Sequence, residues 1–461
     1  MRFLVLLIFT ACTLHPRYER PDVPMPEAWR TELPSREYAD LRWWRQLGDP
    51  ILNELVENSM KQNQELKVAI SRIDQFCAEL GVVRSKLLPQ LELLGGFTRQ
   101  KISDSVLAAP QGQDLFNVFG FLFQPSYWVD IWGEVRSAAQ AARFDYLASI
   151  DAAHLVTLQL TSSVVNTYVQ LRQADAQLAI SMRTLYTRQE GLDQAKLRFD
   201  LGLTSQMPVE QALSEVEVAQ VRVELYTKII AEAENLLSLL LGEPSHNIAR
   251  GAPLDQLSMP ASIPAEAPAD IICMRPDVQQ MEHKLMAANA NIGVARAKFL
   301  PKIMADGSWG SEASRWTDFL RTPATVWSWG GDFVQQIFTG GRLISNLRLS
   351  QAKKKEAIYE YAQTLLNGVR EVNDALIAHK IALETEKTQK ARVEALAQYR
   401  YLSYLRYQEG ENDYLTFLDA ERHLFQGQLD YEDAKGNSFY TLTAIFESLG
   451  SSWYPPEKPN Y

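Results

Sequence analysis

The chain has 461 residues, and its 56 acidic residues outnumber its 46 lysines and arginines, which gives a formal net charge of −10 at pH 7. This charge argues against nucleic acid as a partner, because binding to phosphates needs a surplus of basic residues. Mean hydropathy is −0.20, and beyond the N-terminus no apolar run approaches the roughly 18 residues that a membrane helix needs. A polytopic helical membrane protein is therefore excluded, whereas membrane strands are not, because they carry only a weak alternating signal.

The N-terminus is typical of a short bacterial export signal. Arg2 precedes an apolar run, and Thr10-Ala11-Cys12 places small residues directly before a cysteine. This pattern resembles a lipobox, in which the signal peptide 1–11 is removed and Cys12 becomes the lipidated first residue. We expect a covalent lipid such as palmitate on Cys12; the alternative is an ordinary signal followed by a free thiol.

No motif in the chain indicates catalysis. The six histidines form no HxxxH or HExxH pair, and neither a P-loop nor GxSxG is present. Cys77 and Cys273 form no CxxC motif, and we interpret them as buried free thiols, with a disulfide as the alternative. We predict no catalytic residue, no metal site and no cofactor apart from the lipid.

Proline-free intervals and residue periodicity predict the elements of the first half. In chain order they are a helix over 51–88, a strand after Pro89, a second strand near 115–131, a very long helix over 133–200 and a return helix near 209–241. At about 1.5 Å per residue the long helix spans roughly 100 Å. Apolar residues recur along it every seventh position, which indicates a coiled coil: Val164, Leu171, Leu178, Leu185, Leu192 and Phe199.

The second half repeats the first. Gly81-Val82-Val83-Arg84 returns 212 positions later as Gly293-Val294-Ala295-Arg296, and Leu241-Gly242 returns 208 positions later as Leu449-Gly450. The repeat predicts a short helix over 277–300, strands after Pro301 and near 324–338, a long helix over 341–408 and a return helix near 413–449. The organisation we predict is an N-terminal extension 12–50, repeat 1 at 51–241, a linker 242–275, repeat 2 at 276–450 and a tail 451–461.

The two strand pairs carry a pattern typical of a membrane interface. Each alternates apolar and polar residues, and six of the ten tryptophans lie in or beside them. A pair of soluble hairpins is the alternative. Four strands cannot close a barrel, and an open edge in lipid leaves backbone groups unpaired. If the strands are embedded in a membrane, several chains must share one barrel.

At this point the sequence resembles the TolC-type outer-membrane efflux channels, in particular the OprM/NodT lipoprotein branch. The motifs that carry this resemblance are distributed over nearly the whole chain. Each motif alone is a weak indication of the family, but their order and spacing together are highly specific. These motifs include Cys12 with Pro16–Pro21, Trp43-Trp44, Asp130-Ile131-Trp132-Gly133, Arg275-Pro276-Asp277, Phe338–Arg342 and Tyr414–Ala420.

The resemblance implies a mostly α fold with membrane β structure. Duplicated helical hairpins from three copies would form a periplasmic α-barrel, continuous with an outer-membrane β-barrel to which each chain gives four strands. It also implies a homotrimer anchored by lipid in the outer membrane with a long periplasmic extension. The partners would be a periplasmic adaptor and an inner-membrane pump of the RND, ABC or MFS type.

The resemblance also supplies site residues. Asp419 lies nine residues after Gly410, where the family has an aspartate at the channel aperture, and three copies would favour a bound cation or proton. Tyr407 matches a tyrosine that helps to latch the tip. Pro208 stands where the family usually has an aspartate, and Glu210 is a candidate to compensate. A solvated carboxylate and coiled-coil packing are the alternative interpretations of Asp419 and Tyr407.

We therefore predict a passive exit duct of a tripartite efflux or secretion system. It would open when the adaptor and pump engage the two turns, formed by Gly202, Leu203 and Thr204 and by Gly410, Glu411 and Asn412. A periplasmic coiled-coil lipoprotein without a pore is the alternative, and an enzyme is the third possibility, against which the missing catalytic motifs argue. The sequence does not choose between drugs, metal ions and proteins as cargo.

Overall fold

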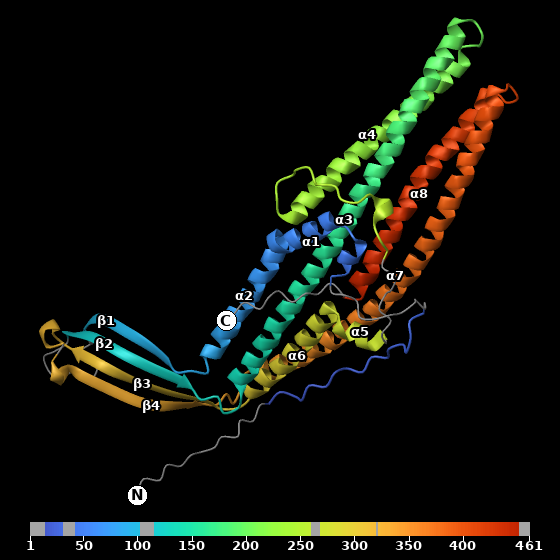
Figure 1. Ribbon diagram of the computed structural model, residues 1–461. Helices are drawn as coiled ribbons and strands as arrows, with labels where there is room; N and C mark the ends of the chain where they lie inside the picture. Colours follow the sequence, from blue (N-terminus) through green and yellow to red (C-terminus); the bar gives the residue numbers. More distant parts are fainter. Residues whose placement is uncertain (1–13, 31–41, 102–114, 260–267, 320, 451–461) are drawn as a thin grey trace. The chain divides into compact units, whose positions relative to one another are not determined.

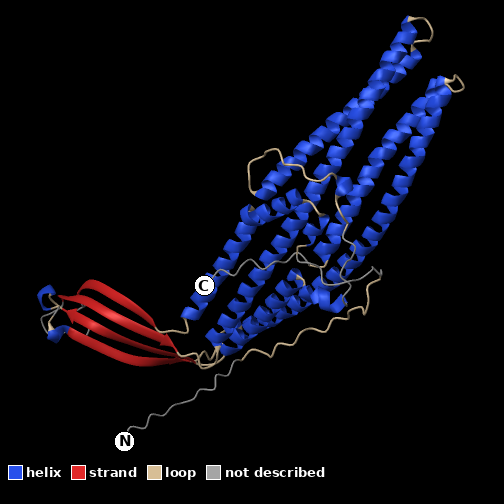
Figure 2. Ribbon diagram, in the orientation of Figure 1, coloured by secondary structure: helices blue, strands red, loops and turns tan. Residues whose placement is uncertain are grey.

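The structure is a computed structural model that describes residues 14–30, 42–101, 115–259, 268–319 and 321–450. The export signal, Cys12 and the C-terminal tail lie outside these ranges. Figures 1 and 2 show the chain by element and by secondary structure. Its helices and strands are α1 Pro50–Gln62, α2 Gln64–Ser85, β1 Gln90–Lys101, β2 Leu115–Trp128, α3 Glu134–Asp200, α4 Met207–Leu241, α5 Pro268–Met274, α6 Pro276–Ala297, β3 Lys302–Ala313, β4 Thr325–Val334, α7 Arg342–Gln408 and α8 Tyr414–Ser448, with short 3-10 turns at Trp43–Leu47, Leu254–Gln256, Trp316–Asp318 and Thr322–Ala324.

The duplication is visible in the element lengths. The long helices α3 and α7 have 67 residues each, α4 and α8 have 35, and α2 and α6 have 22. β3 begins 212 residues after β1, and α7 begins 208 residues after α3, so the four-residue difference falls between β1 and α3. The predicted helix 51–88 is instead two helices. Asn63 separates them, since its amide accepts from Leu66 N at 2.9 Å and donates to Leu240 O at 2.9 Å.

The described residues divide into two compact units, and both draw on both repeats. Among the described residues, unit 1 is built from those within 14–22, 72–150 and 280–362, and unit 2 from those within 23–71, 151–279 and 363–450. Unit 1 holds the sheet and most of α6, whose first four residues belong to unit 2, and unit 2 holds α1, α4, α5 and α8. The helices α2, α3 and α7 contribute residues to both.

The sheet of unit 1 has four antiparallel strands in the order β1-β2-β3-β4 (Figure 2). Its register pairs odd-numbered residues with odd-numbered residues throughout, as in Leu93 with Phe123 and Phe123 with Trp309. Side chains alternate between the faces of a sheet, so all odd positions share one face. β1 and β4 are the outer strands, and each has one side without a partner strand in this chain.

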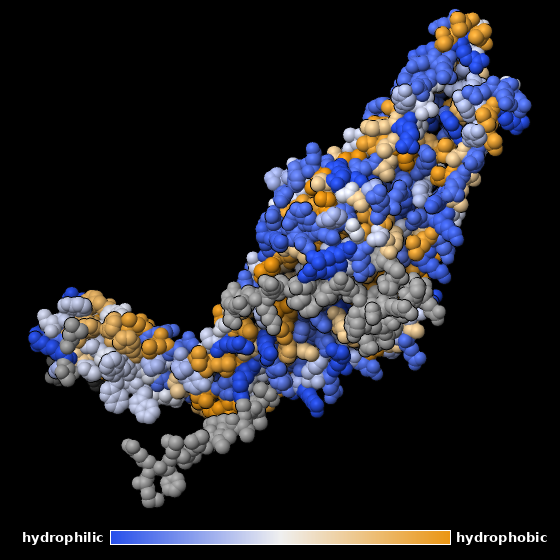
Figure 3. All heavy atoms as spheres, in the orientation of Figure 1, coloured by the Kyte–Doolittle hydropathy of each residue, from blue (hydrophilic) through white to orange (hydrophobic). Residues whose placement is uncertain are grey.

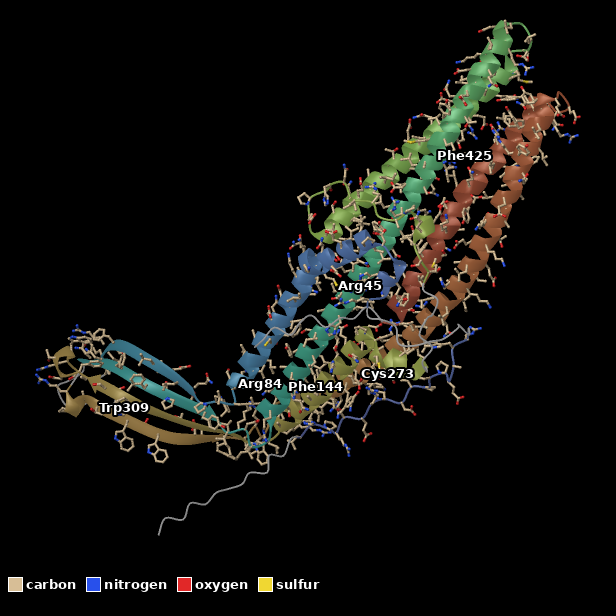
Figure 4. All side chains as sticks on the ribbon, viewed as in Figure 1. Arg45, Arg84, Phe144, Cys273, Trp309 and Phe425 are labelled. Carbon is tan, nitrogen blue, oxygen red and sulfur yellow. The ribbon has the colours of Figure 1, made fainter. Side chains whose placement is uncertain are left out.

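The two faces of the sheet are chemically opposite. The odd face carries almost all the aromatic rings: Phe97, Phe119, Phe121, Phe123, Tyr127, Trp309, Trp327, Trp329 and Phe333. The even face carries all the described carboxylates of the strands: Glu92, Asp306, Glu312 and Asp332. Several of the rings are exposed, Trp329 at 81% and Trp309 at 60%; Figure 4 marks Trp309 on the sheet, and Figure 3 shows hydrophobic residues at its surface.

An N-terminal strap, residues 14–20, lies along α6 in unit 1. Arg296 donates to Leu14 O at 3.0 Å, and Asn289 donates to Pro16 O at 2.7 Å. Farther along, Arg20 forms a two-bond ion pair with Glu282. The six residues from Leu14 to Arg20 in extended chain and the 14 residues from Glu282 to Arg296 in helix both span roughly 20 Å. The strap can therefore contact α6 along its whole length.

In unit 2, part of the predicted apolar stripe of α3 is buried. Val164 and Leu171 are fully buried, and Leu192 is 2% exposed, but Phe199 near the end of the helix is 42% exposed. The prediction that both remaining cysteines are buried is wrong for Cys77, which is exposed, whereas Cys273 is half-buried.

Within the described part of the chain, no helix combines the length and apolar character needed to cross a membrane.

Candidate functional site

Each long helix of unit 2 reverses direction at a glycine. Gly202 and Gly410 have φ values of 71° and 76°, a left-handed conformation that glycine adopts without steric cost. Leu203 N donates to Arg198 O at 2.9 Å, and Glu411 N donates to Arg406 O at 2.9 Å. These six-to-one bonds end both helices in the same way, so the two predicted turns are structurally equivalent.

The two turns differ in side-chain chemistry. The first presents Leu201 and Leu203, which are 64% and 67% exposed. The second presents Glu409 and Glu411, and Glu411 pairs with Arg406 at 3.2 Å within its own turn. Thr204 of the first turn and Asn412 of the second are both half-buried.

Tyr407 lies in the last turn of α7 and joins the two helical hairpins. Its hydroxyl accepts a hydrogen bond of 2.8 Å from Arg198, in the last turn of α3. Its ring stacks on Phe417 with an interplanar angle of 7° and packs against Tyr414, both of α8. Burial is the main cause that raises the pKa of Tyr414 to about 12, so this hydroxyl stays protonated at neutral pH.

Asp419 lies on α8, five residues beyond its first residue, Tyr414. Its carboxylate is half-exposed, and His423 Nε2 lies 3.5 Å from Asp419 Oδ2, one helical turn along. A carboxylate and an imidazole at this spacing face the same side of a helix. Within this chain, Asp419 and Tyr407 do not contact each other in any hydrogen bond or ion pair among the described residues.

Glu210 lies in the first turn of α4 and does not reach the second hairpin. Its carboxylate accepts a bond of 2.9 Å from Gln206, four residues earlier. Pro208 lies at the second position of α4, where proline is compatible with a helix start. In this conformation the first hairpin meets Tyr407 through Arg198 and not through Glu210.

A second link between the hairpins was not predicted from the sequence. Arg188 of α3 is 5% exposed and lies 3.0 Å from Glu215 of α4, whose other carboxylate oxygen lies 2.5 Å from Arg422 of α8. The Arg188 guanidinium also lies 5.0 Å from the centre of the Phe425 ring, labelled in Figure 4. Burial lowers the pKa of Arg188. The signal in the sequence was a charged residue, Arg188, three positions after Leu185 in the predicted coiled coil.

No group of three or more histidine, cysteine, aspartate or glutamate side chains in the described ranges is arranged to hold a metal ion.

Residues 55–243 and 267–451 match the outer membrane efflux protein family. The chain is 31% identical over 459 residues to the probable efflux pump outer membrane protein SepC of Pseudomonas putida, covering 96% of this chain and 95% of that one. It is 30% identical to the outer membrane protein OprJ of Pseudomonas aeruginosa, covering 98% and 95%. The chain belongs to the outer membrane efflux protein family.

Solved structures share the fold. The outer membrane channel CmeC of Campylobacter jejuni aligns with a TM-score of 0.91 at 22% identity, over 97% of this chain and 96% of that one. The open state of the MtrE outer membrane channel of Neisseria gonorrhoeae aligns with a TM-score of 0.86 at 25% identity, over 97% and all of that chain. The predicted TolC-type fold, mostly helical with four strands per chain, is confirmed.

Proposed function

We propose that the chain is the outer-membrane channel of an efflux system, a passive duct through which another component drives the cargo. The observation that carries this is the sheet with its two unlike faces. An aromatic odd face suits lipid, whereas an even face with Glu92, Asp306, Glu312 and Asp332 needs water. A water-filled bore is the arrangement that satisfies both faces.

The sheet also requires more than one copy of the chain. Its outer strands β1 and β4 end the hydrogen-bonded order, and unpaired backbone groups in lipid cost several kcal/mol each. Three copies supply enough strands for a closed barrel, whereas one copy does not reach the smallest known size of about eight. A homotrimer with a shared barrel is therefore our proposed assembly.

The gate belongs at the turns of the two hairpins. Tyr407 and Asp419 would hold and line the closed aperture, and the glycine turns at Gly202 and Gly410 would receive a periplasmic adaptor, which links the duct to an inner-membrane pump. The equivalent geometry of the turns supports a shared docking role. The relative SepC is named as an outer membrane protein of an efflux pump, which supports partners of this kind.

The same proposal places the protein in the outer membrane, held additionally by a lipid on Cys12. It predicts no catalytic activity and no cofactor besides this lipid. Nucleic acid is not among the proposed partners.

Conductance in planar bilayers tests the gate. Purified full-length protein should form channels that are mostly closed, and Asp419→Ala combined with Tyr407→Phe should raise the open probability. If the double variant gates like the parent chain, the assignment of these residues is wrong. A protein that never conducts and forms no trimer in detergent would favour the periplasmic coiled-coil lipoprotein without a pore.

A further inference from the structure

Unit 1 contains two adjoining cavities, one where its helices meet its strands and one among its helices. The first, of about 660 Å³, is mostly apolar and lies between the end of α2, the ends of β2 and β3 and the start of α3. Its walls include Val82, Leu88, Trp128, Ile131 and Trp132. It has the size of a small-molecule site.

The second cavity, of about 480 Å³, is basic. It lies between α3, α6 and α7, and its walls include three lysines, Lys284, Lys298 and Lys353. The two cavities share Val294 and Lys298, so they adjoin at the end of α6. Three neutral donors complete the polar lining of the second cavity: Asn291, Asn346 and Ser350.

The positive charge of the second cavity is poorly neutralised. None of the salt bridges found among the described residues involves Lys284, Lys298 or Lys353. The one carboxylate in the wall is Asp145, and burial raises its pKa, with a further contribution from Glu79 and an opposing one from Lys284. The wall therefore holds three lysines against one carboxylate.

The apolar cavity borders the even face of the sheet. Ser126 and Trp128 in the apolar cavity occupy even positions of β2, on the same face as the strand carboxylates. On α6, the cavity residues Lys284, Asn291 and Lys298 lie on the opposite side of the helix from the residues that hold the strap. In the trimer proposed above, we place this side of α6 towards the bore.

We propose that the joined cavities are a cargo site for an amphipathic organic anion. The anionic head would lie among the three lysines and the apolar body against Trp128 and Ile131. This inference rests on the proposed function, because the bore is what would deliver such a molecule. The carboxylates farther along the even face would repel the same anion, so it would bind transiently before leaving.

The test uses a matched pair of probes, naphthalene-2-sulfonate and the neutral naphthalene-2-sulfonamide. Binding is measured by equilibrium dialysis with full-length protein in phosphatidylcholine nanodiscs, and the uptake by empty nanodiscs is subtracted. We expect the sulfonate to bind at least about tenfold more tightly than the sulfonamide at low salt, with a preference that shrinks as salt rises.

The decisive variant carries Lys284→Gln, Lys298→Gln and Lys353→Gln together and should lose this preference. A charge-matched control carries Lys355→Gln, Lys380→Gln and Lys387→Gln, all exposed positions of α7 outside both cavities, and should keep it. Equal binding of the two probes by the parent chain, or equal loss in both triple variants, would overturn the proposal.

Two further measurements separate the alternatives. If anionic phosphatidylglycerol nanodiscs abolish sulfonate binding at constant ionic strength, the cavity holds a lipid headgroup and the cargo site is wrong. Bilayer conductance of the same preparation reports on the channel itself. Conducting protein that shows no sulfonate preference would contradict the cargo site alone, and the proposed function would stand.

Discussion

Arg198 and Tyr407 join the ends of the two long helices by a single hydrogen bond of 2.8 Å between guanidinium and phenol. The residues belong to different repeats, 209 positions apart, and each lies directly before a glycine turn. Because both side chains are partly exposed, water can replace this bond at little cost. A contact of this kind suits a latch that must release.

Loss of the Arg198 side chain should loosen the latch. A hydrogen bond of this type contributes about 1 kcal/mol, so Arg198→Ala should raise the open-to-closed ratio roughly fivefold per subunit that must release. Single-channel recordings measure this ratio. Arg183→Ala, an exposed arginine on the same helix, serves as the control, and equal effects of the two variants would argue against the latch.

The buried Arg188–Glu215 pair should matter for stability more than for gating. Arg188→Leu leaves the buried Glu215 carboxylate with only Arg422, at a cost of about 3 to 5 kcal/mol when a partner of a buried pair is removed. Thermal unfolding of the purified protein should show a clear drop. Arg188→Leu combined with Glu215→Leu should recover much of it, and a double variant as unstable as the single one would contradict the charge argument.

Stability should fall in mild acid because of His154. Burial lowers the pKa of this imidazole to about 4, whereas an unfolded histidine titrates near 6.5. Between these values the unfolded chain binds more protons, so stability is complete above about pH 6.5 and is lost as the pH falls towards 4, by up to about 3 kcal/mol. His154→Gln should flatten the pH profile of the unfolding midpoint between pH 7 and 4.5. A steep profile that persists in the variant would assign it to other groups.

Gly293 should be intolerant of a side chain because the strap covers it. A Cβ atom there would lie 2.8 Å from both His15 Cβ and Ser137 Oγ. Gly293→Ala should therefore displace the strap, and faster amide exchange at residues 14–20 would report this. The matched control is Gly81→Ala, the repeat-equivalent position on α2, where nothing lies within 4 Å. Unchanged exchange in Gly293→Ala would mean that the strap adjusts locally.

Sequence periodicity predicted the helices and strands well, because proline-free runs and glycine turns act locally. The duplication located α7 and α8 from α3 and α4 almost to the residue. The break at Asn63 was missed, although Asn63 caps α2 locally through Leu66 N; its second bond, to Leu240 177 residues away, leaves no local pattern. The exposure of Cys77 was also missed, because the sequence of α2 alone does not show which face of this helix packs against other elements.

The site was predictable only in part. The turns followed from glycine, and Tyr407 and Asp419 followed from the family resemblance. The partner of Tyr407 could not be found this way, because Arg198 and Glu210 are both polar residues near the first turn and only the fold selects between them. The cavities of unit 1 combine residues from both repeats and leave no local pattern.

The unlike chemistry of the two turns has a consequence for assembly. In a threefold complex the six hairpin tips would alternate around the ring. An apolar tip with exposed leucines would be followed by an acidic tip with glutamates. Identical adaptor molecules that dock on both kinds of tip would then meet two different surfaces in turn. Each adaptor molecule would have to bind in one of two ways. Neighbouring adaptor molecules would therefore make different contacts although their sequences are identical.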